Sequence, residues 1–387
     1  MSRMSQSFDA VVIGAGIVGA ACAYYLTRAG LRVAVADRGT VASGTTGAGE
    51  GNILISDKEP GPELELTRLS QRLWRELGAE LGPEAELDPK GGLVVAADPA
   101  SLAGLEQFAA SQAEVGVRTR AVPPGELPEL EPYLARGLAG GVFYPEDMQV
   151  QPMMAAALLL RRAAERGAEL RFRHEVTGLE TSSGRVTGVR TSAGLLSTGL
   201  VVNAAGTWAG EVAGLAGLAL PVLPRRGFIV VTEALPVLIR HKVYTADYVA
   251  NVASGSAGLE VSTVIEGTAG GTVLIGASRE RVGFDRSSSL RIVGLLAARA
   301  ARLFPVLAQA RAIRFYRGFR PYCPDHLPVI GADDRLAGLL HACGHEGAGV
   351  GLAPATGHLI AQLAAGQEPA LPVAPFSPGR FAEAARA

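Results

Sequence analysis

The chain has 387 residues, of which 48% are hydrophobic and 19% charged, and its formal net charge is −1. This composition is too apolar for a disordered chain and too evenly charged for a nucleic-acid-binding protein, so we expect a core large enough for two domains. The three cysteines, Cys22, Cys323 and Cys343, share no CxxC spacing. They predict a reducing, cytoplasmic setting with neither a disulfide framework nor a metal site.

The stretch from Phe8 to Arg38 predicts a strand, a glycine-rich turn, a helix and a second strand. Its motif, Gly14-Ala15-Gly16-Ile17-Val18-Gly19, permits a tight turn and brings backbone N–H groups and the positive end of the helix close to a pyrophosphate. Asp37 lies about 20 residues further on, where a carboxylate can bind a ribose. The stretch predicts a dinucleotide site, and an ordinary βαβ unit is the alternative. Because glycines interrupt the apolar run 11–26, we expect no membrane span.

Residues 42–52 are rich in glycine and hydroxyl side chains and show no apolar periodicity. Such a loop can wrap a polar ligand through its backbone. Its position directly after the nucleotide-binding strand favours contact with phosphate and ring atoms over a plain surface linker.

Helical and strand patterns alternate in the next part of the chain. We expect helices over 63–81, 100–115 and 153–166, an irregular connection over 122–132, and strands over 91–97, 170–179, 186–191 and from 201. The strand from Val201 ends in small residues, which suits close contact with a nucleotide or, alternatively, packing against a helix.

From residue 220 to 281 the pattern changes to strands joined by turns, which is typical of an antiparallel sheet. These strands are expected over 228–232, 243–248, 259–265 and 272–275. A helix over 290–304, strands over 314–320 and 327–330, and a helix from near Ala355 follow. The α/β chain should therefore form a discontinuous nucleotide-binding domain and a second domain built from two inserts.

Six ordered motifs resemble the D-amino acid oxidase (DAO) superfamily of FAD-dependent amine oxidoreductases, which includes glycine and sarcosine oxidases. They are Gly14–Gly19 with Asp37-Arg38, and the segments 43–52, 202–206, 276–280, 318–321 and 344–357. The sequences Gly344-His345-Glu346-Gly347 and Gly49-Glu50-Gly51-Asn52 most resemble the flavoprotein β-subunits of hydroxyproline, proline and opine dehydrogenases.

The resemblance implies a Rossmann-like, glutathione-reductase-type FAD-binding domain over residues 1–90, 146–219 and 316–387. A smaller α+β substrate-binding domain, with a mostly antiparallel sheet, would take up residues 91–145 and 220–315.

The same resemblance implies specific cofactor contacts. The ADP half of FAD would be held by Gly14, Gly16, Ile17, Val18, Gly19, Asp37 and Arg38, with Val176 near the adenine. Phosphate or ribityl oxygens would meet Ser43, Thr45 and Thr46, and Glu50, Gly51 and Asn52 would lie along the isoalloxazine. Backbone N–H groups from Gly347, Gly349, Val350 and Gly351 would point at its N1/C2 carbonyl edge. Ala204, Ala205, Gly206, Trp208, Arg320, His345 and Glu346 complete the set.

Arg320 matches the family arginine that binds the substrate carboxylate, and a planar guanidinium can bind both oxygens at once. Glycine oxidase-like members carry a second arginine where this chain has Gly347, so the carboxylate rests on Arg320 alone or on a further partner. Weak candidates for the substrate amine are Tyr244, Tyr248, Tyr322, His241, His326 and Glu50, with ordinary packing as the alternative. His345 either faces the flavin or supports its loop.

Gly318 stands roughly where sarcosine oxidase-like members attach flavin to a cysteine, so the resemblance implies non-covalent FAD. The implied reaction is hydride transfer from the α-carbon of an amino or imino acid to flavin N5. Three hypotheses follow: a catalytic dehydrogenase subunit passing electrons to an iron–sulfur protein or second flavoprotein, an oxidase that uses oxygen, and a non-catalytic FAD-bearing subunit.

Overall fold

The computed structural model describes residues 7–252 and 254–381. A six-stranded sheet lies at its centre, and its neighbouring strands run parallel except for the antiparallel pair β19/β20. In spatial order the strands are β19 (Val329–Ala332), β20 (Leu339–Cys343), β13 (Val201–Asn203), β2 (Ala10–Ile13), β3 (Val33–Asp37) and β9 (Glu169–Phe172). The βαβ unit expected at the start of the chain is therefore confirmed.

Alternate side chains of the central strands reach two different apolar cores. Ala10 and Val12 of β2 pack with the helices of one face, whereas Val11 and Ile13 pack against the other face. The helices are α1 (Ile17–Arg28), α2 (Pro62–Leu81), α5 (Pro152–Glu165) and α9 (Gly349–Ala364). The other face carries α6 (Ala209–Gly214) and a four-stranded sheet of β1 (Ser7–Phe8), β12 (Gly194–Thr198), β11 (Arg185–Thr191) and β10 (Val176–Ser182).

An eight-stranded sheet forms the second part of the molecule. Its order is β18 (Ala312–Tyr322), β14 (Leu223–Thr232), β17 (Val273–Arg279), β16 (Glu260–Gly267), β15 (Lys242–Thr245), β5 (Gly92–Ala96), β7 (Gly140–Tyr144) and β6 (Arg120–Val122). Only β15 and β5 pair in parallel, so the expected mostly antiparallel sheet is confirmed. β18 crosses the expected domain boundary at residue 316.

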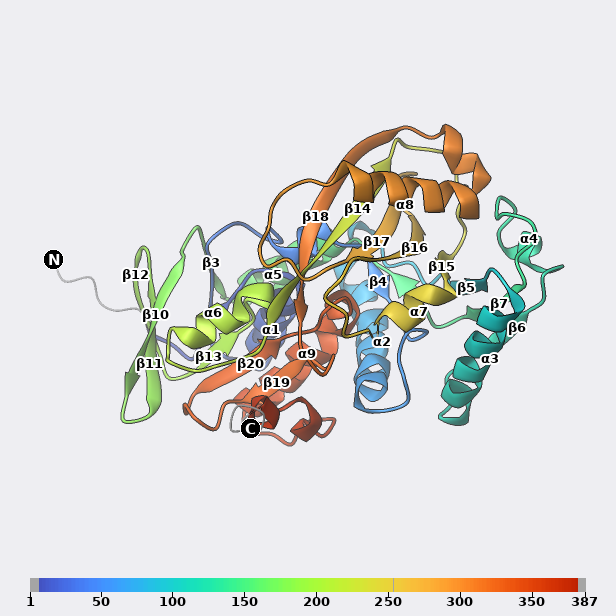
Figure 1. The fold of residues 1–387 in the computed structure, drawn as a ribbon. Helices are drawn as coiled ribbons and strands as arrows, with labels where there is room; N and C mark the ends of the chain where they lie inside the picture. Colours follow the sequence, from blue (N-terminus) through green and yellow to red (C-terminus); the bar gives the residue numbers. More distant parts are fainter. Residues whose placement is uncertain (1–6, 253, 382–387) are drawn as a thin grey trace.

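Four helices accompany the eight-stranded sheet: α3 (Pro99–Glu114), α4 (Leu127–Leu130), α7 (Ala246–Val252) and α8 (Leu290–Leu303). Figure 1 shows α8 lying over β14 and β17, and its Ile292 and Leu296 share a core with Phe228 and Val230 of β14. A two-stranded sheet of β4 (Asn52–Ile53) and β8 (Met148–Gln149) completes the strands. Every helix in the described ranges is too short or too polar to span a bilayer.

Two expected strands differ in the structure. The strand expected over 170–179 is two strands, β9 and β10, which belong to different sheets; Arg173 between them has a φ of 59°, which breaks the extended backbone. The strand expected over 243–248 ends at Thr245, and α7 begins at Ala246. The Thr245 hydroxyl bonds the Asp247 carboxylate in the first turn, a position that favours acidic side chains. Tyr248 is therefore helical.

The last helix begins six residues earlier than expected, at Gly349, and contains Pro354. Proline has no N–H to donate to the carbonyl four residues before it. The Trp74 indole of α2 supplies that donor, because its Nε1 lies 3.1 Å from the Val350 carbonyl oxygen. A proline that usually marks a helix start is thus accommodated inside α9 by a side chain from another helix.

Candidate active site

The site is built first from the glycine turn between β2 and α1. Gly14 has a φ of +115°, and a Cβ there would overlap the Ala204 carbonyl oxygen. A Cβ at Gly19 would overlap the Gly14 carbonyl oxygen in the same way, so Gly19 permits close packing of helix and strand. Together these glycines leave the N-terminus of α1 open to a cavity of about 510 Å³, which Gly14, Gly16 and Ile17 line.

Asp37 and Thr46 hold their side chains beside this helix N-terminus. The Asp37 carboxylate accepts hydrogen bonds from the Ala15 N–H (2.8 Å) and the Gly39 N–H (2.7 Å). The Thr46 hydroxyl accepts one from the Ile17 N–H at 3.0 Å. A carboxylate fixed at the end of β3 and a helix N-terminus that faces the same cavity match the requirements of a ribose and a pyrophosphate.

Segments far apart in the sequence also line this cavity. Glu50 and Asn52 come from the N-terminal part of the chain, and Gly347, Gly349 and Val350 come from its C-terminal part. Gly349 and Val350 are the first residues of α9, so the positive ends of two helices, α1 and α9, reach one cavity. Such an arrangement suits a ligand with two anionic or electron-rich groups.

Aromatic side chains form another wall of the 510 Å³ cavity, called the first cavity below. The Arg38 guanidinium lies 4.4 Å from the ring centre of Trp208, and the Trp208 ring stacks on Phe284 at 5.3 Å. Arg38 and Trp208 both line the cavity, together with Val176. The remaining lining residues among those expected to hold the cofactor are Val18, Ser43, Thr45, Ala204, Ala205, Gly206, Arg320, His345 and Glu346.

Three expected glycine contacts have a packing role in the described structure. A Cβ at Gly51 would overlap the Val150 carbonyl oxygen, and a Cβ at Gly351 would lie 3.4 Å from the Asn52 carbonyl oxygen. Neither glycine, nor Gly19, is among the described residues that line the cavity. They bring the lining segments together rather than forming the wall.

Glu50 is a buried carboxyl group in the wall of the first cavity, with 8% of its surface exposed. Within the described residues its Oε1 has no hydrogen-bond partner, and Oε2 lies 3.4 Å from the Asn52 amide nitrogen. Burial raises the pKa of Glu50; the positive charges of Lys242 and Arg320 oppose this shift and the Glu266 carboxylate adds to it. Lys242 and Glu266 are buried and form an ion pair with each other.

A second cavity of about 440 Å³ adjoins the first. The residues that line both are Tyr248, Arg320, His345, Glu346 and Gly347. Arg320 therefore stands where the two cavities meet. Burial lowers the pKa of Arg320, and the positive charge of Arg279 lowers it further. One of its N–H groups donates to the Ser278 carbonyl oxygen at 2.8 Å, which leaves most of the guanidinium fork facing the cavities.

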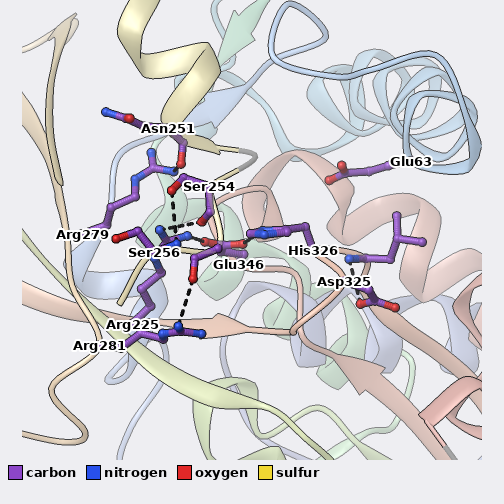
Figure 2. Close-up of polar contacts among 12 residues, drawn as sticks. Glu63, Arg225, Asn251, Ser254, Ser256, Arg279, Arg281, Asp325, His326 and Glu346 are labelled. Atoms are coloured by element: carbon purple, nitrogen blue, oxygen red, sulfur yellow. Dashed lines mark hydrogen bonds and ion pairs between the residues drawn. The ribbon is translucent and has the colours of Figure 1, made fainter. Parts of the chain in front are cut away.

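The C-terminal loop, residues 344–348 between β20 and α9, is held by buried polar contacts. Glu346, whose φ is 46°, accepts from the Arg225 guanidinium at 2.5 Å and from His326 Nδ1 at 2.9 Å, as Figure 2 shows. His345 Nε2 lies 2.9 Å from the Thr356 hydroxyl, and burial lowers the pKa of His345 to about 3. His345 thus lines both cavities and also bonds Thr356 of α9.

Three of the candidates for amine binding lie elsewhere in the described structure. The Tyr244 hydroxyl donates to Asp147 at 2.8 Å and contacts Ser56. The Tyr322 ring lies between the guanidiniums of Arg225 and Arg281, and His241 bonds Glu131 at 3.0 Å. None of the three is a described lining residue of either cavity, whereas Tyr248, Glu50 and His326 line at least one of them.

Two cysteines, Cys323 and Cys343, lie in or near this site as buried thiols. Cys323 is buried against Gly344, and burial raises its thiol pKa to about 12. Cys343 does line the first cavity, and burial raises its pKa well above the usual range. Searching the described ranges finds no group of three or more His, Cys, Asp and Glu side chains arranged to hold a metal ion.

Sequence reasoning missed Arg279, which lines the second cavity, and the buried pair Lys242–Glu266 behind Glu50. Arg279 had appeared only as one position of a motif. The charge of Lys242 gave no signal, because its partner lies 24 residues away on another strand. These residues become visible only when the strands are paired.

Comparison with known proteins agrees with this geometry. The family model described as FAD dependent oxidoreductase (DAO) matches residues 9–363. Hydrogen cyanide synthase subunit HcnC of Pseudomonas aeruginosa is 31% identical, with 98% of this chain and 97% of the relative covered. Glycine oxidase of Geobacillus kaustophilus is 32% identical, with 97% of each covered.

Two solved structures extend the likeness to the fold. The crystal structure of the Geobacillus kaustophilus glycine oxidase superposes with a TM-score of 0.88 at 31% identity, covering 96% of this chain and 98% of that one. L-proline dehydrogenase from P. horikoshii gives a TM-score of 0.89 at 25% identity, covering 98% and 99%. The family model covers most of the chain, and the cavity with two helix N-termini and the Asp37 carboxylate agrees with it. The chain therefore belongs to the DAO family of FAD-dependent oxidoreductases.

Proposed function

We propose that the protein is a dehydrogenase that oxidises the C–N bond of a small amino or imino acid, such as a D-amino acid or a proline-like or hydroxyproline-like compound. The observation that carries this proposal is the position of Arg320 where the cofactor-sized cavity meets a second cavity. An arginine at this junction can hold the carboxylate of a substrate whose α-carbon faces the first cavity.

The residues of the first cavity fit FAD. The Gly14 turn packs against Ala204 so closely that a Cβ would overlap its carbonyl oxygen, and it leaves the N-terminus of α1 at the cavity. The N-termini of α1 and α9 supply donors for anionic groups, and Glu50 Oε1 is a buried polar atom without a partner among the described residues. When bound, FAD supplies the hydride acceptor that such an oxidation needs. We also propose that the cofactor is held without a covalent bond. Gly318, which lines the first cavity, has no thiol to attach a flavin, Cys323 lies outside the described cavity walls, and burial keeps the Cys343 thiol in the wall protonated by raising its pKa.

The chain itself would bind and orient the substrate. Arg320 holds the carboxylate, and the Tyr248 ring, which lines both cavities, forms a side wall. Glu50 and Glu346 both line the first cavity and act on Arg320 through their charge, but the oxygens of Glu346 bond Arg225 and His326, whereas Glu50 Oε1 has no partner among the described residues. We therefore assign the amine to Glu50. Burial raises the pKa of Glu50, which favours its uncharged form, and the nearby positive charge of Arg320 disfavours an ammonium ion. Both effects keep the substrate nitrogen in the neutral form that can be oxidised.

The relatives bear on the electron acceptor. HcnC, which is named as a subunit, supports the proposal that this dehydrogenase is the catalytic subunit of a larger complex, whose partner would be an iron–sulfur protein or a second flavoprotein. The glycine oxidases favour the alternative of a self-contained oxidase, and a non-catalytic FAD-bearing subunit is the other alternative. We also propose a cytoplasmic setting, supported by three free buried cysteines. The division into FAD-binding and substrate-binding segments stays our proposal, with β18 reaching from one into the other.

The test is anaerobic reduction of the bound flavin by a panel of amino acids that includes D-proline, L-proline and the hydroxyprolines. We expect bleaching by at least one of them, and no bleaching by any would favour the non-catalytic subunit. Peroxide formation in air by the isolated chain would favour the oxidase. Arg320→Ala should keep its flavin and raise KM by orders of magnitude, because losing a buried charge pair costs about 2–5 kcal/mol. An unchanged KM would remove Arg320 from the site.

A further inference from the structure

Two arginines, Arg320 and Arg279, line the second cavity. Arg279 ends β17 with only 4% of its surface exposed, and Arg320 is partly exposed along the cavity walls. The two guanidiniums are close enough for the charge of Arg279 to lower the pKa of Arg320. A fold gains nothing by placing two like charges together in a poorly solvated place unless an anion joins them.

Neither arginine has a carboxylate within 4 Å among the residues that the structure describes, although many other arginines do. Glu346 acts on both through its charge, but its two oxygens are taken by Arg225 and His326. The hydrogen bonds of the pair go to backbone carbonyls instead: Arg320 donates to Ser278 at 2.8 Å and Arg279 to Asn251 at 2.6 Å.

These carbonyl contacts hold the pair in position without neutralising it. The Ser278 carbonyl that anchors Arg320 belongs to the residue directly before Arg279, so one strand end sets the position of both guanidiniums. The Arg279 guanidinium also lies 5.4 Å from the ring centre of Tyr248, which lines both cavities. Figure 2 shows Arg279 extending toward Asn251.

We propose that Arg279 is the second carboxylate-binding arginine of this site and that it takes the place of the arginine that position 347 lacks. The inference rests on the proposed function, since it assigns a second contact to the same substrate carboxylate that Arg320 binds. A single carboxylate held by two guanidiniums is fixed in orientation as well as in position.

Position 347 offers a direct test of this exchange. A Cβ at Gly347 would lie 3.9 Å from Arg320 Nε and 4.0 Å from its Cδ, which is ordinary van der Waals contact. A side chain can therefore be added there, beside Arg320. Arg281 provides a matched control, because it lies two residues beyond Arg279, donates to the Gly255 carbonyl and stacks on Tyr322, and is not among the described lining residues.

The experiment titrates the FAD-loaded protein with cyclopentanecarboxylate, a proline-shaped anion that cannot be oxidised at nitrogen, and follows the flavin absorbance to obtain Kd. Arg279→Met should weaken binding by about 10- to 100-fold, the range expected for the loss of one hydrogen bond to a charged group. Arg281→Met should change Kd by less than about twofold, as for a surface charge. The neutral amide, cyclopentanecarboxamide, should bind all variants alike. Arg279→Lys, with a charge but no fork, should fall between wild type and Arg279→Met.

The double variant Arg279→Met with Gly347→Arg should regain affinity for the carboxylate but not for the amide. If Arg279→Met binds the carboxylate like wild type, or if the double variant regains nothing, the proposal is overturned. Should Arg279→Met lose its flavin, Arg279→Lys is the deciding variant: a Kd equal to wild type overturns the proposal. If carboxylate binding depends on Arg279 while no amino acid reduces the flavin, the proposed function fails and the two-arginine site stands.

Discussion

The Arg225 guanidinium and the Glu346 carboxylate lie 2.5 Å apart and join β14 of the eight-stranded sheet to the C-terminal loop that lines both cavities (Figure 2). Arg225 is completely buried, and its other terminal nitrogen donates to Glu260 at 3.0 Å. One cation therefore balances two carboxylates from different parts of the chain. The pair fixes the position of the loop in which the sequence motif Gly344-His345-Glu346-Gly347 lies.

Arg225→Met should lower the free energy of unfolding by about 3–5 kcal/mol, because it leaves the largely buried carboxylates of Glu346 and Glu260, whose side chains are 9% and 18% exposed, without their main counter-charge. Urea denaturation of the flavin-loaded protein measures the change. Arg118→Met is the matched control: its side chain is 69% exposed and 3.6 Å from Glu146, so its loss should cost at most about 1 kcal/mol. Equal effects of the two substitutions would contradict a special role for the Arg225–Glu346 pair.

Trp74→Phe should lower the free energy of unfolding by about 1–3 kcal/mol, the cost of leaving a buried acceptor without a partner. The substitution removes the indole N–H that reaches the Val350 carbonyl at 3.1 Å, while Ser70 still donates to the next carbonyl, that of Gly351. Because Val350 lies in the first turn of α9, at the cavity wall, the Kd for FAD should rise as well. Unfolding and flavin-release titrations measure the two effects. A variant as stable as wild type would show that the Val350 carbonyl, which Pro354 leaves without a helical donor, needs no donor from Trp74.

The sequence predicts best those parts of the site whose function is local. Gly14 and Asp37 work through the turn and strand that contain them, so their positions follow from a short pattern. Tyr244 shows where such reasoning fails. Its residue type suits an active site, but side chains alternate along β15, so Tyr244 reaches Asp147 while its neighbour Val243 packs in a different apolar core. Arg279 could not be predicted for a different reason. It lies on β17 and Arg320 lies on β18, and the two strands are separated in the sheet by β14, so their shared cavity follows only from the strand order.

The neutral state of His345 should make the protein less stable in acid. Burial lowers its pKa to about 3 from a usual value of 6.5. Between these values the unfolded chain binds a proton that the folded chain does not. The free energy of unfolding should therefore fall as the pH drops through this window, by up to about 1.4 kcal/mol per pH unit from this group.

His345→Gln keeps a polar group within reach of Thr356 and removes the titration. The difference between wild type and His345→Gln, measured by urea denaturation at a series of pH values from 7 down to about 4, isolates the histidine from the carboxylates that titrate in the same range. We expect the wild type to lose stability more steeply. Parallel curves would mean that His345 takes up a proton in the folded state.

The contact between α1 and α9 depends on a glycine whose substitution should be costly. A Cβ at Gly357 would lie 2.6 Å from both the carbonyl carbon and the carbonyl oxygen of Ala21, which are backbone atoms that cannot turn aside. Gly357→Ala should therefore separate the two helices that reach the first cavity and cost about 1–3 kcal/mol of stability, as overpacking does.

Gly104, in the interior of α3, is the matched control: it is exposed and has no atom within 4 Å of its Cβ position among the described residues. Gly104→Ala should instead raise the free energy of unfolding by about 0.5–1 kcal/mol, the helix preference of alanine over glycine. Thermal or urea unfolding of the two variants should thus shift in opposite directions, and Gly357→Ala should also bind FAD less tightly. A shift of the same sign in both would show that helix propensity, rather than the close approach of α1 to α9, governs position 357.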